Sequence, residues 1–216
     1  MNYHSVSLAD RVFEKLEDDI VHGVIPTNDI ITEVKIAEIM GVSRTPIREA
    51  FRRLEQESLI KDIGKGYQVL GITNENLIDI MDIRIALEPL ASYYAALNIT
   101  PEGIRKLRDI LDLQEFYSAK RDVDHLREED EVFHDAICRL SGRTVIADTL
   151  LPLHRKTRLY RRISIESDKR RSCSLDEHKK IFEAIAASDC ELASKLTAEH
   201  VNRAKKNMME RLGYHG

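Results

Sequence analysis

Four side chains in the second half of the chain have the chemistry of metal ligands. Asp130 and His134 are four residues apart, so on a helix both project from one face. His178 lies near the start of one expected helix and His200 in the middle of the next, and these two helices are expected to be antiparallel neighbours. One carboxylate and three imidazoles are good ligands for a divalent ion, with zinc as first choice and nickel or manganese as alternatives. Taken alone, the pair Asp130 and His134 is only a weak sign of a metal site, because such pairs more often belong to the ordinary packing of a helix.

A second set of side chains is suited to contact DNA. Arg44, Arg48 and Arg52 repeat every four residues and line one face of an expected helix. Another face of the same helix is apolar and carries Ile47, Phe51 and Leu54. Such a helix can pack on a small core while its arginines reach into the major groove. A solvated amphipathic helix is the alternative, and the neighbouring elements argue against it.

The residues before this helix complete a helix-turn-helix pattern. A shorter helical pattern covers residues 33–40, and Gly41 with Val42 then ends it. Ser43 or Thr45 can cap the helix that follows. A helix, a tight glycine turn and a second helix that is basic near its N-terminus are typical of DNA-binding helix-turn-helix units.

The remaining elements of the first 72 residues predict a winged helix. Two β-prone runs at residues 58–61 and 67–70 flank the glycines around Lys65, which predicts a hairpin with this lysine at its tip. Residues 8–21 carry apolar side chains at helical spacing and form a supporting first helix. Three helices and a two-stranded wing predict a module that binds DNA.

Beyond a boundary near residues 71–74 the pattern is helical throughout. Six helices are expected, at residues 74–97, 100–119, 124–140, 143–164, 175–187 and 189–212, with a polar break through residue 174 before the fifth. Short connections between helices of this length favour an antiparallel bundle. The expected fold is therefore mainly α, with an N-terminal winged helix-turn-helix over residues 1–72 and an all-α antiparallel bundle over residues 73–216.

Composition excludes a protein that coats nucleic acid without selectivity. The net charge is −4, and residues 1–72 hold nine Lys and Arg against twelve Asp and Glu. Positive charge is concentrated between residues 43 and 65, a segment that contains six basic and four acidic side chains. Three scattered cysteines without a C-x-x-C pair are typical of a reducing compartment. No apolar run approaches ~18 residues and no signal peptide opens the chain, so the expected location is the cytoplasm, without membrane contact.

Residues 8–70 resemble the DNA-binding domain of the GntR superfamily of bacterial transcription regulators. The resemblance lies in residues 20–23, residues 41–50, which read GVSRTPIREA, and the wing residues 65–69. It implies groove and wing contacts by Arg44, Thr45, Arg48 and Gly66, with Ser43 contacting a phosphate or capping the helix. By their positions on the arginine face and at the wing tip, Arg52 and Lys65 complete the predicted DNA-binding set.

Residues 74–212 resemble the all-helical FCD effector domain that follows this type of winged helix. The matching motifs are R-x-x-x-E-P at residues 84–89, D-x-x-F-H-x-x-I at residues 130–137 and E-H-x-x-I-x-x-A-I at residues 177–185, followed by a histidine at position 200. In metal-binding members of that family the aspartate and the three histidines hold the ion. The resemblance therefore implies that the ligands here are Asp130, His134, His178 and His200.

A ligand-anchoring metal implies a buried cation that completes the site for a small organic acid. Arg84 is the candidate for binding the effector carboxylate, because guanidinium pairs bidentately with carboxylate. An intrahelical pair with Glu88, four residues on, is the alternative. The basic run at residues 155–162 is expected to be mainly a solvated face, from which one member can reach an acidic ligand.

These features predict a regulator rather than an enzyme. A helix-turn-helix monomer covers one half-site, so a homodimer on a near-palindromic double-stranded operator is expected. A small carboxylate metabolite in the bundle would change DNA affinity, most simply by relieving repression. The first alternative is a metal-dependent, hydrolase-like enzyme with an appended winged helix, although the sequence offers no separate general base or nucleophile motif. The second is a regulator with a purely structural metal and no effector.

Overall fold

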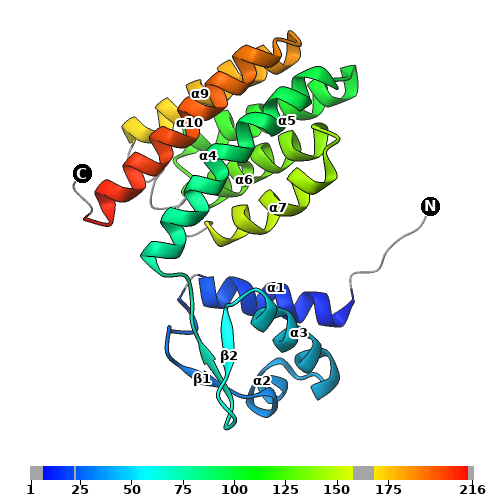
Figure 1. The fold of residues 1–216 in the computed structure, drawn as a ribbon, viewed down its shortest axis with the longest axis vertical. Helices are drawn as coiled ribbons and strands as arrows, with labels where there is room; N and C mark the ends of the chain where they lie inside the picture. Colours follow the sequence, from blue (N-terminus) through cyan, green and yellow to red (C-terminus); the bar gives the residue numbers. More distant parts are fainter. Residues whose placement is uncertain (1–6, 22, 158–167, 214–216) are drawn as a thin grey trace. The chain divides into compact units, whose positions relative to one another are not determined.

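The computed structural model describes residues 7–21, 23–157 and 168–213, and its backbone forms two compact units, Met1–Thr73 and Asn74–Gly216 (Figure 1). Helices dominate both units, and the described strands all belong to one small sheet in the first unit. This confirms the predicted class, a winged helix-turn-helix followed by an all-α bundle. Among the described helices, none combines the length and the apolar character that crossing a membrane requires.

The first unit packs three helices against a three-stranded antiparallel sheet. The helices are α1 (Leu8–Val21), α2 (Glu33–Met40) and α3 (Arg44–Gln56). The sheet has the order β1 (Ile30–Ile31), β3 (Tyr67–Val69), β2 (Ile60–Asp62), so the wing hairpin has a third strand at its edge. The sequence analysis missed β1, because two residues are too short to show alternation.

The turn between α2 and α3 fixes the orientation of α3 relative to α2. Thr32 caps α2, with its Oγ1 accepting a hydrogen bond from the amide of Lys35 at 3.3 Å. Gly41 ends α2 in the left-handed region at φ 65°, which glycine adopts without steric cost. Ser43 occupies the N-cap position of α3, but its side chain makes no capping hydrogen bond. The predicted side-chain cap at this helix is therefore absent.

The tip of the wing needs glycine for a steric reason. Gly66 has φ 151°, and a Cβ placed on it would lie 2.9 Å from the backbone oxygen of Ile31 in β1. Asp62 accepts a hydrogen bond from the amide of Gly64 at 2.7 Å, which closes the turn before Lys65. Since the third strand occupies the space of a side chain, residue 66 is required to be glycine by packing alone.

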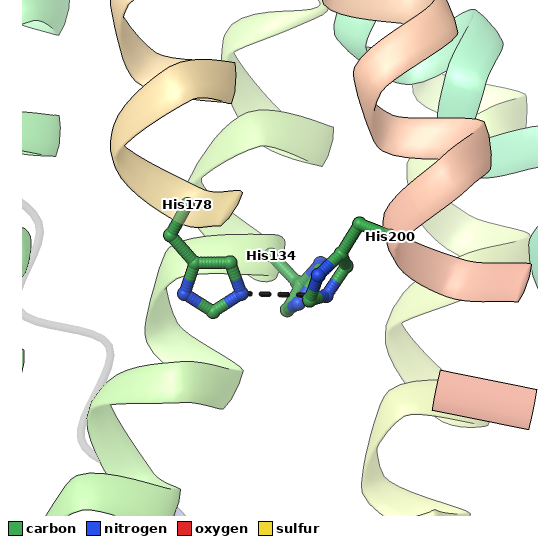
Figure 2. A group of neighbouring side chains, drawn as sticks. All are labelled: His134, His178 and His200. Atoms are coloured by element: carbon green, nitrogen blue, oxygen red, sulfur yellow. Dashed lines mark hydrogen bonds between the residues drawn. The ribbon is translucent and has the colours of Figure 1, made fainter. Parts of the chain in front are cut away.

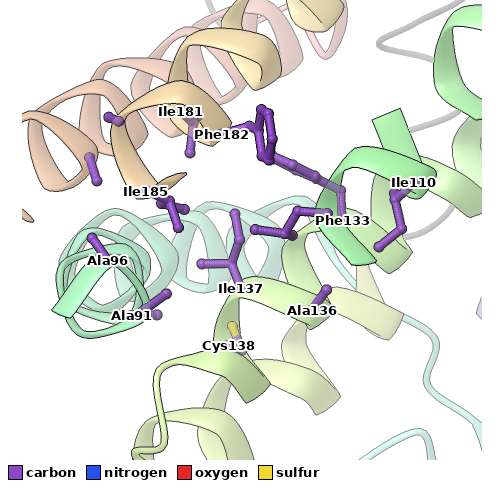
Figure 3. Packing of buried hydrophobic residues seen from close by; sticks show 14 of the residues in the cluster. Ala91, Ala96, Ile110, Phe133, Ala136, Ile137, Cys138, Ile181, Phe182 and Ile185 are labelled. Carbon is purple, nitrogen blue, oxygen red and sulfur yellow. The ribbon is translucent and has the colours of Figure 1, made fainter. Parts of the chain in front are cut away.

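The described part of the second unit contains six helices. They are α4 (Asn74–Leu97), α5 (Pro101–Lys120), α6 (Val123–Leu140), α7 (Thr144–Lys156), α9 (Asp168–Ala186) and α10 (Cys190–Arg211). Helices α4 and α10 pack against each other more extensively than any other pair of described helices, while α6 packs against α4, α5 and α7. Figure 3 shows apolar side chains of several helices meeting around Phe133, Ile137 and Ile181. This core holds α6, α9 and α10 at fixed separations, and these helices carry the predicted metal ligands.

Two of the expected helix boundaries are wrong. The polar break through residue 174 is absent, because α9 already begins at Asp168 and buries Arg171 and Ser174. Polarity was a poor guide here, since arginine and lysine are good helix formers. Helix α7 ends at Lys156, and the rest of the expected helix to residue 164 lies outside the described residues, as does most of the basic run at 155–162.

Candidate metal centre and nucleic-acid interface

Three histidines from three helices meet in the interior of the second unit (Figure 2). His134 comes from α6, His178 from α9 and His200 from α10, and each residue is at most 3% exposed. One ring nitrogen of each lies within 4.8 Å of the others. The shortest separation, between Nε2 of His178 and Nε2 of His200, is 3.3 Å.

Asp130 lies beside this cluster rather than within it. Its carboxylate oxygens are 3.7 Å from Nε2 of His178 and 4.0 Å from Nε2 of His134. The side chain is buried one helical turn before His134, as the spacing of four residues predicts. The structure therefore brings the three imidazoles together and leaves the carboxylate next to two of them.

Each imidazole of the cluster has an acceptor at its outer nitrogen, Nδ1. The three contacts are His134 with Oε2 of Glu88 at 3.0 Å, His178 with Oε1 of Gln114 at 2.8 Å, and His200 with Oε2 of Glu177 at 2.7 Å. A carboxylate can only accept, so Nδ1 of His134 and of His200 carries the hydrogen. Outer partners of this kind fix both ring orientation and tautomer at metal sites.

Gln114 fixes the same tautomer in His178, with the hydrogen on Nδ1. Its amide nitrogen donates to the backbone oxygen of Glu129 at 2.9 Å, which turns Oε1 toward His178. Nδ1 of His178 is therefore the donor, and its Nε2 carries a lone pair. All three Nε2 atoms of the cluster have this electronic state.

The donor set fits a divalent cation. Two neutral Nε2 atoms 3.3 Å apart have no hydrogen to share, so their lone pairs repel each other unless a positive charge lies near both. With Zn–N bonds of 2.0–2.1 Å, two nitrogens of a tetrahedral zinc site lie about 3.3 Å apart. The observed separation of 3.3 Å is therefore compatible with two ligands of one zinc ion.

Glu88 links the cluster to other buried polar groups. One of its oxygens lies 2.5 Å from Nε of Arg84 and 3.1 Å from Nε2 of His154, and the other faces His134. Burial alone would raise the pKa of the Glu88 carboxyl, but the charge of Arg84 and the hydrogen bonds from His134 and His154 hold it well below its usual range. Arg84 also approaches the hydroxyl of Thr157 at 3.4 Å. The intrahelical pair of Arg84 with Glu88 is thus present in this structure.

Small cavities flank the histidines. One, of about 10 Å³, lies beside His134 and is lined by Glu88, Ser92 and Thr197 among others. A second of the same size lies beside His178, next to Asp130 and Gln114. A volume near 10 Å³ is that of about one water site. An organic acid can therefore enter only if side chains around His134 move.

The arginine face predicted for α3 is exposed in the first unit. Arg44, Arg48 and Arg52 are all exposed, while Ile47, Phe51 and Leu54 are fully buried in the core. Ser43, Thr45 and Lys65 are exposed as well. Arg53 differs, because it pairs with Asp10 of α1 at 2.6 Å and stacks over the ring of Phe13. It holds α3 to α1 instead of facing outward.

Glu33 joins the two arginines at the start of α3, a contact that the sequence analysis missed. Oε2 of Glu33 lies 3.1 Å from Nη2 of Arg44, and its two oxygens lie 3.3 and 3.4 Å from Nε and Nη2 of Arg48. Partial burial would raise the pKa of Glu33, but the hydrogen bonds from Arg48 and Arg44 lower it below its ordinary value. The carboxylate is therefore ionised and lies between two guanidinium groups.

Comparison with known proteins gives matches along most of the chain. Residues 8–66 match the bacterial regulatory proteins of the gntR family, and residues 79–203 match the FCD domain. YdhC of Bacillus subtilis (strain 168), an uncharacterized HTH-type transcriptional regulator, is 28% identical over 195 residues, which is 89% of this chain and 87% of that protein. The HTH-type transcriptional repressor RspR of Escherichia coli (strain K12) is 24% identical over 201 residues, 93% of this chain and 88% of the repressor.

Solved structures share the fold. The structure of E. coli McbR/YncC superposes with a TM-score of 0.81 at 22% identity, covering 96% of this chain and 99% of that one. A putative GntR regulator from Rhodococcus sp. RHA1 gives a TM-score of 0.73 at 23% identity, with 96% and 99% covered. Both likenesses span the winged helix and the helical bundle together.

Proposed function

We propose, from the premise that this chain belongs to the gntR family of bacterial regulatory proteins and carries an FCD domain, that it is a homodimeric repressor controlled by a metal-anchored organic acid. The chain is a DNA-binding transcriptional regulator and not an enzyme, since the family and the relatives that it matches are regulators. The hydrolase-like alternative is thereby set aside. Repression as the sign of regulation is supported by RspR, which is named a repressor.

The proposed DNA contacts come from the winged helix, which we assign to residues 1–72. They are Ser43, Arg44, Thr45, Arg48, Arg52, Lys65 and Gly66. Support comes from the exposure of the charged members and from the burial of Ile47, Phe51 and Leu54 on a separate face of α3. One winged helix reads one half-site, so a homodimer would bind a near-palindromic operator in the cytoplasm, where the bacterial chromosome lies.

The proposed metal ligands are His134, His178 and His200, with Asp130 as the fourth. The observation that carries this site is the convergence of three buried Nε2 lone pairs, two of them 3.3 Å apart. When bound, the ion would supply a positive charge and open coordination positions to which a carboxylate can bind. Zinc is our first choice, and nickel and manganese remain alternatives with the same ligand types.

The proposed effector is a small carboxylate held in the FCD domain, which we assign to residues 73–216. The cavity beside His134 has the hydroxyls of Ser92 and Thr197 on its wall, and these bond each other at 2.7 Å. Arg84 is the buried cation that would pair with the acid. To do so, its guanidinium would have to break its ion pair with Glu88 and bind the carboxylate of the acid instead. A structural metal without an effector is the competing proposal.

Native mass spectrometry of the protein as purified tests the metal and the acid together. We expect a dimer that carries one divalent ion per chain and a small residual mass. An ion without a residual mass would favour the structural metal, provided that citrate, succinate and acetate also fail to change the melting temperature. A dimer that stays free of metal after zinc is added would contradict the site.

The outer partners of the histidines are expected to tune metal affinity. Replacing Glu177 by alanine removes the acceptor at Nδ1 of His200 and should weaken zinc binding about 10- to 100-fold, as found for such partners elsewhere. Competition with a chromophoric chelator measures the change. Glu199→Ala, which removes an exposed carboxylate from the same pair of packed helices, is the control and should keep the affinity of the unmodified chain. Equal affinities in the two variants would contradict a supporting role for Glu177.

A further inference from the structure

The two arginines at the start of α3 share one carboxylate. The Glu33 side chain is 16% exposed, whereas those of Arg44 and Arg48 are 58% and 66% exposed. Glu33 is the first residue of α2, directly after the Thr32 cap, and the Gly41 turn connects α2 to α3. The carboxylate therefore sits on a fixed base, and the long arginine side chains lie over it.

The pairing uses one particular edge of Arg48. Guanidinium has two edges with paired N–H donors, one formed by Nε and one Nη, and the other formed by the two Nη groups. Glu33 occupies the first, since its oxygens lie near Nε at 3.3 Å and near Nη2 at 3.4 Å. The terminal edge of Arg48, formed by Nη1 and the second hydrogen of Nη2, takes no part in these contacts. That edge has the geometry that binds O6 and N7 of guanine in the major groove.

We infer that Glu33 is a positioning residue for DNA recognition, which orients Arg48 and Arg44 so that they read guanine. The inference rests on the proposed function, because it needs α3 in the groove. Two neighbouring guanidinium groups repel each other, and a shared anion lets both stay side by side before DNA is bound. Holding long side chains in one geometry also lowers the ordering cost at binding.

The same carboxylate should weaken binding to DNA in general. Affinity without sequence preference comes from neutralised phosphates, and an anion beside the arginines reduces that attraction. Glu33 therefore acts in two opposite directions, by favouring the guanine contact and by opposing phosphate contacts. Specificity is a difference of affinities, so both effects increase the discrimination between operator and other DNA.

The alternative is that Glu33 masks the arginines and has to release them before DNA binds. Masking predicts that removal of the carboxylate tightens binding to every duplex, the operator included. Positioning predicts that the operator is bound more weakly while other DNA is bound as tightly or more tightly. The two cases therefore predict opposite changes in operator affinity when the Glu33 carboxylate is removed.

The experiment starts from the full-length dimer and a library of random duplexes. The unmodified chain is used to enrich its preferred duplex, and affinities are then measured for this duplex and for a scrambled one at a fixed salt concentration. For Glu33→Gln we expect the preferred duplex to be bound about tenfold more weakly, the scale of one guanine contact. Binding to the scrambled duplex should stay equal or become tighter. Glu38→Gln, an exposed carboxylate on the same helix, controls for the charge change and should shift both duplexes alike.

Two further measurements separate the possible failures. Melting temperatures show whether each variant folds, and Glu33→Asp keeps the charge while shortening the reach, so it should weaken the preferred duplex without tightening the scrambled one. Tighter binding of the preferred duplex by Glu33→Gln, or an unchanged ratio between the two duplexes, would overturn the inference. If the unmodified chain enriches no duplex at all, the proposed function itself fails.

Discussion

Replacing Arg48 by alanine is expected to abolish specific operator binding. A bidentate arginine–guanine contact is worth about 1–3 kcal/mol, and a dimer loses it in both half-sites, so affinity should fall by about a hundredfold or more. Arg48 is exposed, whereas the core residues Ile47 and Phe51 of the same helix are buried, so the fold should survive the change. Fluorescence anisotropy with an enriched duplex measures the loss.

Two controls accompany this variant. Arg105→Ala removes an exposed arginine from α5 and should leave operator affinity unchanged. The metal content of Arg48→Ala should equal that of the unmodified chain, because the metal ligands lie in the other unit. Retained specific binding by Arg48→Ala would mean that α3 is not the helix that reads DNA.

Replacing His134 by alanine is expected to remove the metal and the stability that the metal provides. An ion present at a hundred times its dissociation constant stabilises the folded state by about 2.7 kcal/mol, which for a chain of this size is roughly 5–10 °C in melting temperature. The unmodified protein should lose this increment when a chelator is added. His134→Ala should melt at one temperature, below that of the metal-loaded protein, with or without chelator, and its metal content by elemental analysis should fall to near zero.

The chelator separates loss of metal from loss of packing. His134→Ala also removes a buried contact to Glu88, and this lowers stability whether or not metal is present. His125→Ala, an exposed histidine on the same helix, should keep the chelator effect of the unmodified chain. If the unmodified protein melts at one temperature regardless of chelator, the metal proposal fails.

Helix positions could be predicted from sequence wherever an apolar stripe or a cap was strong. The bounds expected for α1, α2 and α4 agree with the structure, because their apolar spacing is regular and each boundary has a Gly, Asn, Ser or Thr nearby. The start of α9 could not be predicted, since its first turns are polar in sequence, and Arg171 and Ser174 become buried only through packing. Strand β1 exists because it pairs with β3 far along the chain, and two residues carry no local signal of that pairing.

The candidate sites divide in a similar way. The pair Asp130 and His134 and the arginine face were visible as residue types at helical spacing, and the resemblance to the FCD domain added His178 and His200 to the predicted metal ligands. Their partners were not, because Gln114 and Glu33 act through contacts that depend on how separate helices meet. Glu88 and Glu177 did leave a trace, since one lies four residues after Arg84 and the other directly before His178. Neither position by itself indicates a role in orienting an imidazole.

Because one carboxylate group serves both His134 and Arg84, the proposed ion and the proposed acid share a common intermediary. An acid that draws Arg84 away leaves more of the Glu88 negative charge to His134 and so makes that imidazole a stronger donor. By thermodynamic reciprocity, the acid raises the affinity of the protein for the ion by the same factor by which the ion raises its affinity for the acid. The regulator would then respond to the product of two concentrations, as a coincidence detector for metal and metabolite.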